Sequence, residues 1–297
     1  LGGGLGEPFL RSKKGSPKLS SHETPIMNDV VYIVLDSCRY DAWEAAATPN
    51  LDRLGSVERR WSYASWTSPS HQVLLMGLLP HVSPAGVYAS EVYRRELLGW
   101  RERLGAAELE FAGFLPQLNL PTALKRLGYR TLGRVSLPVL NQYTVFATGF
   151  DDYRLMASHA DFAGMIKEMS FEPDRPSFWF LNLGETHYPY LLPPGDAPHL
   201  HGVHGVVKDL AGGGGAGEQG PGFDPAEMAR LRAAQVRALE VVDGLLPELY
   251  AKLPPDAWVI VTADHGELFG EEGYFGHGPV MHPKVFEVPF VEGRRPA

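Results

Sequence analysis

The stretch Val30-Val31-Tyr32-Ile33-Val34-Leu35-Asp36 decides the fold, because a continuous apolar run ends there on a carboxylate. Runs of this kind, rich in β-branched residues, are typical of strands that are buried on both faces of a sheet. Two later runs have the same form. Ser177–Leu183 is followed by Gly184-Glu185-Thr186-His187, and Ala257–Ala263 is followed by Asp264-His265-Gly266. The sequence therefore predicts three buried strands, each with polar residues directly after it.

Helical patterns alternate with these strands. One begins at Asp224-Pro225 and continues with apolar residues at helical spacing. Another spans Thr122 to Leu127, stops at Gly128 and leads into a further extended run that starts at Tyr129. This alternation predicts an α/β fold with a mostly parallel sheet that is covered on both faces. Function is then expected at the carboxyl ends of the strands, where the polar residues described above fall.

The composition excludes several classes of protein. The chain has 297 residues, of which 44% are hydrophobic, enough for a sizeable core. Its formal net charge of −8 gives no basic field that could hold a nucleic acid. The single cysteine, Cys38, excludes an intramolecular disulfide and a CxxC zinc site. No apolar run approaches the roughly 18–20 residues of a membrane span or forms the core of a signal peptide, so we predict a cytoplasmic protein.

The organisation of the chain is that of one domain with a leader. Residues 1–26 are rich in Gly, Ser, Pro and Lys, which indicates a disordered leader or residues foreign to the native protein. The domain covers 27–297 and contains a flexible surface loop around 199–223. That loop carries a histidine cluster, for which solvent exposure is favoured over metal binding: His199, His201 and His204. The region 87–114 is expected to form a cap near the active face.

Two groups of residues could carry chemistry. Asp36, Asp264 and His265 each follow a buried strand and together offer two carboxylates and an imidazole to a divalent cation. A lone aspartate after a strand is more often a turn former, but the pair Asp264-His265 is more specific, since Gly266 permits a tight turn. The second group, Trp66-Thr67-Ser68-Pro69-Ser70-His71, precedes an apolar helical stretch. Thr67 is expected to cap that helix, whose N-terminus also suits a phosphate or sulfate.

Four motifs in this order resemble sulfatase-like members of the alkaline phosphatase superfamily. They are Asp36-Ser37-Cys38-Arg39-Tyr40-Asp41, Thr48-Pro49-Asn50-Leu51-Asp52-Arg53-Leu54, Ser65 to His71 with Gly77-Leu78-Leu79-Pro80, and Thr262-Ala263-Asp264-His265-Gly266-Glu267. The resemblance implies a three-layer α/β sandwich around a central, mostly parallel sheet. It makes 27–297 a sulfatase-like metalloenzyme domain, and the short stretch after Asp264 implies that the C-terminal subdomain of longer sulfatases is reduced or absent.

The resemblance also implies roles for individual residues. The implied metal ligands are Asp36, Thr67, Asp264 and His265, with Thr67 also in the position of the nucleophile. His187 and His277 are implied to act on the substrate anion or the leaving group. One divalent ion (Mn, Mg, Ca or Zn) is favoured over two, and a second ion would require Glu185, His187 and His282. Arg39 and Asp41 are expected to support the site from the turn beside Asp36.

The sequence departs from many sulfatases at the nucleophile. Their motif is Cys-x-Pro-Ser-Arg, with the Cys oxidised to formylglycine, whereas this chain has Thr67 and His71 in the Cys and Arg positions. A threonine ester must be resolved by attack at its central atom, which favours phosphorus over sulfur. We therefore predict a metal-dependent hydrolase of a small phosphate, phosphonate or sulfate ester. The alternatives are a phosphotransferase of the same fold and a non-catalytic scaffold that binds an anionic metabolite or a partner protein; the oligomeric state stays open.

Overall fold

A mostly parallel sheet of seven strands forms the centre of the protein, in a computed structural model that describes residues 27–82, 89–109, 119–196, 207–208 and 223–297. The strand order is β2-β10-β7-β1-β5-β3-β4, and only β10 runs against its neighbours. The strands are β1 (Val30–Leu35), β2 (Glu58–Trp61), β3 (Arg130–Val135), β4 (Asp152–Leu155), β5 (Ser177–Leu183), β7 (Trp258–Ala263) and β10 (Glu287–Arg294). The three apolar runs of the sequence are thus β5, β1 and β7, side by side in the middle.

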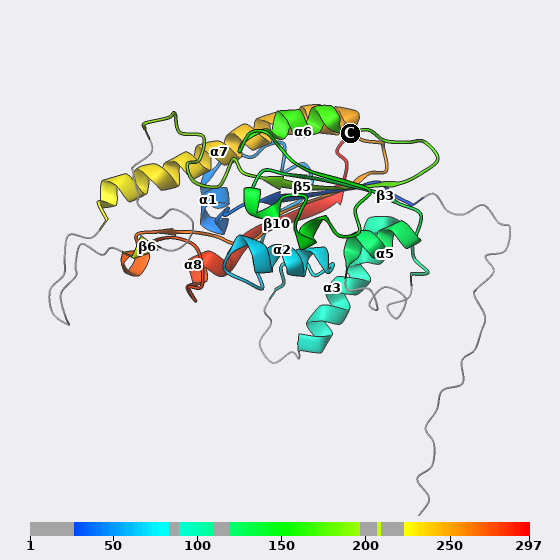
Figure 1. Ribbon diagram of the computed structural model, residues 1–297, viewed down its shortest axis with the longest axis horizontal. Helices are drawn as coiled ribbons and strands as arrows, with labels where there is room; N and C mark the ends of the chain where they lie inside the picture. The colour runs from blue at the N-terminus through cyan, green and yellow to red at the C-terminus, as the bar shows by residue number, and fades with distance from the viewer. Residues whose placement is uncertain (1–26, 83–88, 110–118, 197–206, 209–222) are drawn as a thin grey trace, which may run out of the picture.

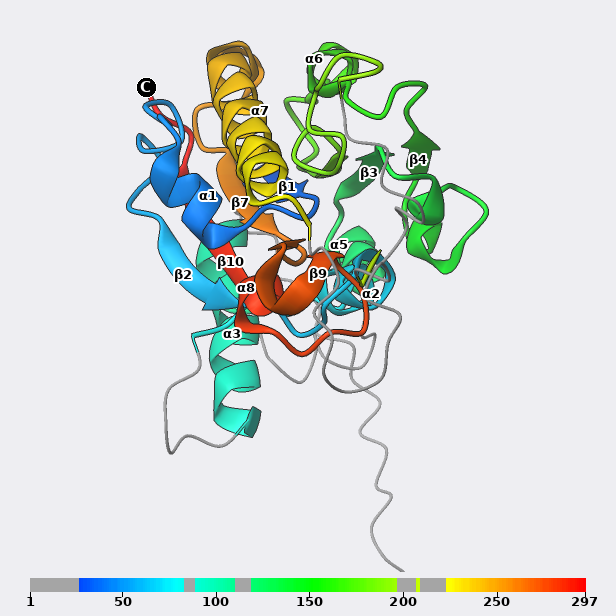
Figure 2. The same ribbon diagram turned by 90° about the vertical axis from the view of Figure 1, so that its left-hand side faces the viewer.

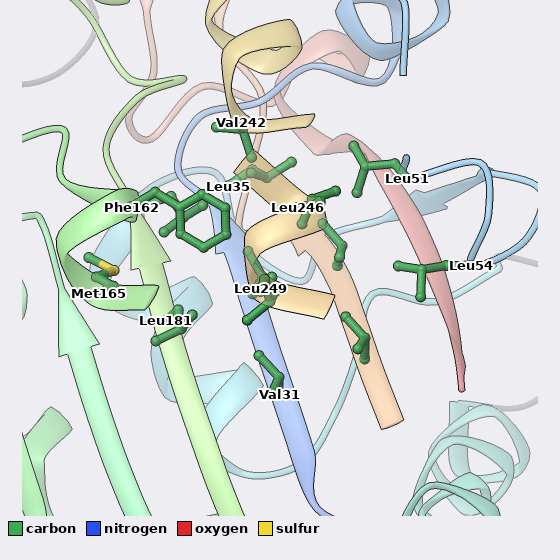
Figure 3. Close-up of a cluster of buried hydrophobic side chains, with 14 of the residues drawn as sticks. Val31, Leu35, Leu51, Leu54, Phe162, Met165, Leu181, Val242, Leu246 and Leu249 are labelled. Atoms are coloured by element: carbon green, nitrogen blue, oxygen red, sulfur yellow. The ribbon is translucent and has the colours of Figure 1, made fainter. Parts of the chain in front are cut away.

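Helices cover both faces of this sheet, as Figure 1 shows. One face carries α1 (Tyr40–Ala45), α6 (Phe162–Glu168) and α7 (Pro225–Lys252), and the other carries α2 (Thr67–Leu75), α3 (Ala89–Leu104) and α5 (Leu120–Arg126). Alternate residues of β1 face the two layers: Val31 packs with Leu249 of α7, whereas Tyr32 packs on the side of α2. Figure 3 shows the first of these two cores. The predicted three-layer α/β sandwich is confirmed.

The helix α3 corrects one expectation, because it is a core element and not a cap over the active face. Its apolar residues Leu97 and Trp100 are buried against the sheet. Leu104 O accepts a hydrogen bond from Asn28 N at 3.0 Å, at the start of β1. That contact lies at the end of the sheet opposite Asp36, since Asp36 follows the end of the same strand. Arg94, Arg95, Arg101 and Glu102 are exposed on the outer face of this helix, whereas Arg103 is buried and donates to Glu292 Oε2 at 2.6 Å.

A second, smaller sheet has the order β6-β9-β8. Its strands are β6 (Val207–Lys208), β8 (Leu268–Phe269) and β9 (Tyr274–Gly276). The strand β6 lies within the predicted loop 199–223, whereas the rest of that loop up to residue 222, with His199, His201 and His204, lies outside the described residues, as do residues 1–26. A short helix, α8 (Pro283–Phe286), precedes β10 at the same end of the sheet as α1 (Figure 2).

Across the parts of the chain that the structure describes, no helix is both long and apolar enough to cross a bilayer. The longest, α7, begins where the sequence predicts: the Asp224 side chain accepts a hydrogen bond from Ala226 N and caps it. The buried residues of its C-terminal part, such as Leu246 and Leu249, pack against the central sheet, whereas Met228 and Leu231 near its start pack with Phe269 and Phe275 of the small sheet. The helix is therefore amphipathic.

Candidate active site

The register of the central strands brings the candidate ligands together. Leu35, the last residue of β1, lies opposite Ala263 of β7 and Leu183 of β5. The residues that follow these strands therefore emerge side by side. Asp36 and Asp264 are completely buried at this edge of the sheet, and they are neighbours although most of the chain separates them in sequence.

Asp36, Thr67, Asp264 and His265 converge on one point. The His265 Nε2 atom lies 3.2 Å from Asp264 Oδ2 and 4.0 Å from Asp36 Oδ1. Thr67 Oγ1 lies 3.3 Å from the same nitrogen. The four side chains thus surround a space into which two carboxylates, a hydroxyl and an imidazole point. These are donor types that Mn, Mg and Zn accept in proteins.

The hydrogen bonds and charges of this cluster fit a cation. His265 Nδ1 donates to Gly266 O at 2.9 Å, which leaves Nε2 as the ring nitrogen that would bind a cation. Asp264 Oδ2 is buried and has no hydrogen-bond partner among the residues that the structure describes. Burial would raise the pKa of Asp264, but His265 holds it well below its usual range. Burial would likewise lower the pKa of His265, yet Asp264 and Asp36 raise it above its usual range. The carboxylates therefore favour a positive charge where His265 Nε2 faces them.

Thr67 is the first residue of α2, and Trp66 occupies the capping position without a side-chain hydrogen bond. The expectation that Thr67 caps the helix is therefore wrong. Its hydroxyl faces His265 instead, because the side chain of the first helical residue turns toward the end of the sheet. A hydroxyl in this place also lies beside the free backbone N–H groups and the positive end of the helix dipole.

His71, one turn further along α2, belongs to the cluster, which the sequence did not reveal. Its side chain is fully buried, and Nδ1 donates to Thr67 O at 2.9 Å and lies 3.4 Å from Asp264 Oδ2. Ligand atoms of Asp36, His71 and Asp264 lie within 4.8 Å of one another. Since Asn182 Nδ2 is 3.2 Å from His71 Nε2, both ring nitrogens have partners. His71 thus connects the nucleophile segment to the carboxylates. The helical spacing of Thr67 and His71 was the signal that could have shown this.

Two further residues orient the carboxylates. Asn182, inside the apolar run of β5, donates to Asp36 Oδ2 at 3.0 Å. Ser37 donates its backbone N–H to Asp264 Oδ1 at 3.1 Å and its hydroxyl to Asp36 Oδ1 at 3.2 Å. It adopts a left-handed backbone conformation with φ 61°, which is uncommon for a residue with a Cβ. The only signal for Asn182 was a polar residue in a strand that is otherwise apolar.

Gly266 has a different role from the predicted tight turn. Its φ is not among the left-handed values of this chain, so the turn itself does not require glycine. A Cβ atom at this position would instead meet the backbone oxygen of Lys284 at 2.1 Å. The Gly266 N–H donates to Val285 O at 2.7 Å. Glycine is therefore needed because α8 packs directly against the segment that carries His265.

His187 and His277 line one cavity together with Thr67, with a volume of about 390 Å³. Their ring centroids are 5.3 Å apart, and the ring of His277 is 4.3 Å from that of His265. His277 Nδ1 lies 3.2 Å from Oε1 of the buried Glu267. Burial and the neighbouring His265 lower the pKa of His277, which favours a neutral ring that donates its Nδ1–H to Glu267. The carboxylate of Glu267, present in a motif but without a predicted role, orients this imidazole.

The candidates for a second ion do not come together among the described residues. Glu185 Oε1 accepts a hydrogen bond from Phe162 N at 2.8 Å, at the start of α6. His282 caps α8, and its Nδ1 accepts from Lys284 N at 3.1 Å. No contact within the described ranges joins either of them to His187. Glu185 Oε1 and His282 Nδ1 thus have local structural partners, whereas Glu185 Oε2 is buried without a hydrogen-bond partner among the described residues. A site of one ion stays our prediction.

The turn after Asp36 is held by the residues expected to support it. Arg39 is buried, and its Nε and Nη2 atoms donate to both carboxylate oxygens of Asp41 at 2.8 and 2.7 Å. Its Nη1 atom donates to Glu271 Oε1 at 2.6 Å and so ties the turn to the loop after β8. Burial raises the pKa of the Cys38 thiol. That side chain is a buried, unreactive part of the turn.

Three solved structures share this fold at low sequence identity. The C-terminal periplasmic domain of EcEptC from Escherichia coli, in complex with Zn, has a TM-score of 0.55 and 16% identity over 92% of this chain and 74% of that chain. The phosphonate monoester hydrolase of Agrobacterium radiobacter has a TM-score of 0.56 and 17% identity over 89% of this chain and 68% of that chain. BT4656, solved with its substrate D-glucosamine-2-N,6-O-disulfate, has a TM-score of 0.55 and 16% identity over 90% of this chain and 71% of that chain. These likenesses establish the fold alone, and no curated protein sequence matches the chain.

Family membership rests on the sequence itself. The sulfatase family model matches residues 28–291. This match begins two residues before β1 and ends within β10, and so includes six of the seven strands of the central sheet in full and all four motifs. The chain belongs to the sulfatase family.

Proposed function

We propose that this protein is a metal-dependent hydrolase of a small phosphate or phosphonate ester, with Thr67 as its nucleophile. The observation that carries the proposal is the position of Thr67 Oγ1. It lies 3.3 Å from His265 Nε2, at the N-terminus of α2, in a residue that lines the same cavity as His187 and His277. Asp36, Thr67, Asp264 and His265 would hold a divalent cation, which would lower the pKa of the Thr67 hydroxyl and neutralise developing negative charge.

The side chains of the cavity then have different roles in the reaction. Thr67 Oγ1 gives its proton to His277 and forms a bond to phosphorus while the bond to the ester oxygen breaks. That oxygen leaves with the electron pair and takes up a proton. His187 Nδ1 donates to Tyr188 O at 2.8 Å, which leaves Nε2 to exchange this proton. His277 donates its Nδ1–H to Glu267, so the lone pair of its Nε2 can take up the proton of the Thr67 hydroxyl. Water next attacks phosphorus, and Thr67 leaves as the hydroxyl.

Phosphorus is preferred over sulfur because of the residue at position 67. A formylglycine hydrate can release sulfate by breaking its own C–O bond, but a threonine cannot. Cys38 cannot replace it, since it is buried in the turn after β1. Among the relatives, one hydrolyses phosphonate monoesters and one binds a sulfated sugar. A sulfate ester is therefore the natural comparison substrate.

The test compares the 4-nitrophenyl esters of phosphate, methylphosphonate and sulfate, with bis(4-nitrophenyl) phosphate as the diester, on protein loaded with Mn or Zn. Thr67→Ala should abolish turnover, whereas Thr67→Ser should retain it because the hydroxyl survives. Ser68→Ala is the matched control, since Ser68 lines the same cavity one residue along α2, and it should stay active. Peptide mass spectrometry after an acid quench should find a phosphoryl group on Thr67. Full activity of metal-loaded Thr67→Ala would refute the proposal.

Two alternatives are separated by the same assay. A transferase would accelerate when simple alcohols are added, because an alcohol would replace water in the second step. A non-catalytic scaffold would bind phosphonates without turning over any ester. The cytoplasmic location predicted from the sequence stays a prediction, and one of the solved relatives is a periplasmic domain.

A further inference from the structure

The cavity beside Thr67 has an apolar wall that the proposed chemistry does not use. Trp66 and Val139 are 40% and 47% exposed, although both are large apolar side chains at a polar site. Leu137, Pro138 and Pro279 complete this wall. Apolar side chains that converge on a binding cavity and stay exposed to water mark a surface that a ligand covers.

This apolar wall is fixed relative to the candidate metal ligands. Asn182 Oδ1 accepts a hydrogen bond from Leu137 N at 3.3 Å, while its Nδ2 donates to Asp36 Oδ2 at 3.0 Å. On the other side, Gly278 N donates to Ser65 O at 3.1 Å and joins the segments that carry Pro279 and Trp66. The wall therefore stands at a set distance from the nucleophile without any ligand, which is the preorganisation that selective binding needs.

The charge of the residues that line the cavity determines which part of a substrate can pack on the apolar wall. The described residues that line this cavity include no Lys, Arg, Asp or Glu. A charged group of the substrate, other than the anion at Thr67, would lose water there without gaining a partner. An apolar group would instead gain from burial. The volume of about 390 Å³ leaves room for several carbon atoms next to the phosphoryl group.

Building on the proposed function, we infer that the natural substrate is an anionic ester of an apolar alcohol or phenol, whose apolar part packs on Trp66 and Val139. The selectivity then comes from the wall and the chemistry from the residues around Thr67. Esters of sugars or of other polyols, which need polar partners beyond the anion, are disfavoured.

The test uses alkylphosphonates, which resemble the substrate but contain no ester bond to break. Binding of methyl-, propyl-, butyl- and hexylphosphonate to the metal-loaded full chain is measured by isothermal titration calorimetry. Each added methylene should lower Kd about threefold until the cavity is filled. The compound 6-phosphonohexanoate, which carries a carboxylate at the far end, should bind at least tenfold more weakly than hexylphosphonate.

The variants Val139→Ser and Trp66→Ala should reduce the increase in affinity per added methylene to less than about 1.5-fold. The matched control is Val241→Ser. Val241 is 50% exposed but lies on α7, on the opposite face of the sheet. Its variant should keep the threefold decrease in Kd for each added methylene.

The possible failures are distinguishable. Equal affinities along the series, or a gain that survives both Val139→Ser and Trp66→Ala, would overturn the inference and leave the proposed hydrolysis intact. Binding that follows chain length, in a protein that hydrolyses none of the nitrophenyl esters, would support the apolar wall and overturn the proposed function alone.

Discussion

Gly266→Ala tests whether the close packing of α8 holds His265 in place. The new Cβ would lie 2.1 Å from the backbone oxygen of Lys284, whereas real Cβ contacts are essentially never shorter than 3.0 Å. Because the obstacle is backbone, it cannot rotate away, and the two segments must separate by about 1 Å. Overpacking of this kind costs about 1–3 kcal/mol, and the hydrogen bond from Gly266 N to Val285 O contributes about 1 kcal/mol more.

The expected loss is therefore about 2–4 kcal/mol in the free energy of unfolding. At roughly 2–4 °C per kcal/mol for a domain of this size, Tm should fall by about 5–15 °C in scanning calorimetry. Gly244→Ala is the control, since a Cβ there meets nothing within 4 Å and alanine is the better helix former by about 1 kcal/mol. Its Tm should rise by a few degrees. Metal affinity should fall in Gly266→Ala only, because Gly266 O holds His265 Nδ1. An unchanged Tm in Gly266→Ala would refute the reasoning.

Three further predictions concern the charged residues. Zn or Mn at one hundred times its Kd should stabilise the wild type by about 2.7 kcal/mol, and Asp264→Asn should lose this thermal shift; equal shifts would contradict the assigned ligand. His187→Ala should lower kcat/KM by about 10² to 10⁴ while the thermal shift remains, and loss of the shift would instead make His187 a metal ligand. Burial would raise the pKa of Asp41, but Arg39 and Lys284 lower it to about 2. The stabilisation by the ionised Asp41 is then complete above about pH 4 and disappears as the pH falls toward 2. At pH 6, Asp41→Asn should therefore be about 1 kcal/mol less stable than the wild type, after allowance for solvent screening. Near pH 2 the two proteins should be equally stable. Acid-unfolding curves of both proteins check this, and coincident curves would contradict it.

The sequence predicted the sheet well because its central strands are buried on both faces. A strand such as β1 must be apolar at every position, and this leaves an unambiguous pattern of six residues that ends at Asp36. The helix α7 was equally clear, since Asp224 and Pro225 are strong signals for a helix start. The short strands β8 and β9 left no such pattern, because two or three residues that pair at a rim need no periodicity.

From the sequence, only those residues of the site could be predicted whose side chains are typical metal ligands or nucleophiles. Asp36, Thr67, Asp264 and His265 could be named from their positions after strands and from the resemblance. Ser37 and Asn182 could not, because their importance lies in the direction of their hydrogen bonds, which depends on backbone conformation and on the strand face. His71 was seen only as a replacement for arginine, whereas the turn of α2 places it between Thr67 and Asp264.

The order of strands in the sheet also has a consequence for synthesis on the ribosome. Among the described strands of this sheet, β1 comes first in the chain, but it lies between β5 and β7, which are both made after it. At about 5–20 residues per second, the ribosome needs roughly 10–45 s to reach β7 after it has completed β1. During that time the segment Val30–Leu35 has no partner strand on the side of β7, and its six apolar residues are a segment that aggregates or binds a chaperone. We therefore expect the yield of folded protein to depend on how this segment is protected before β7 arrives.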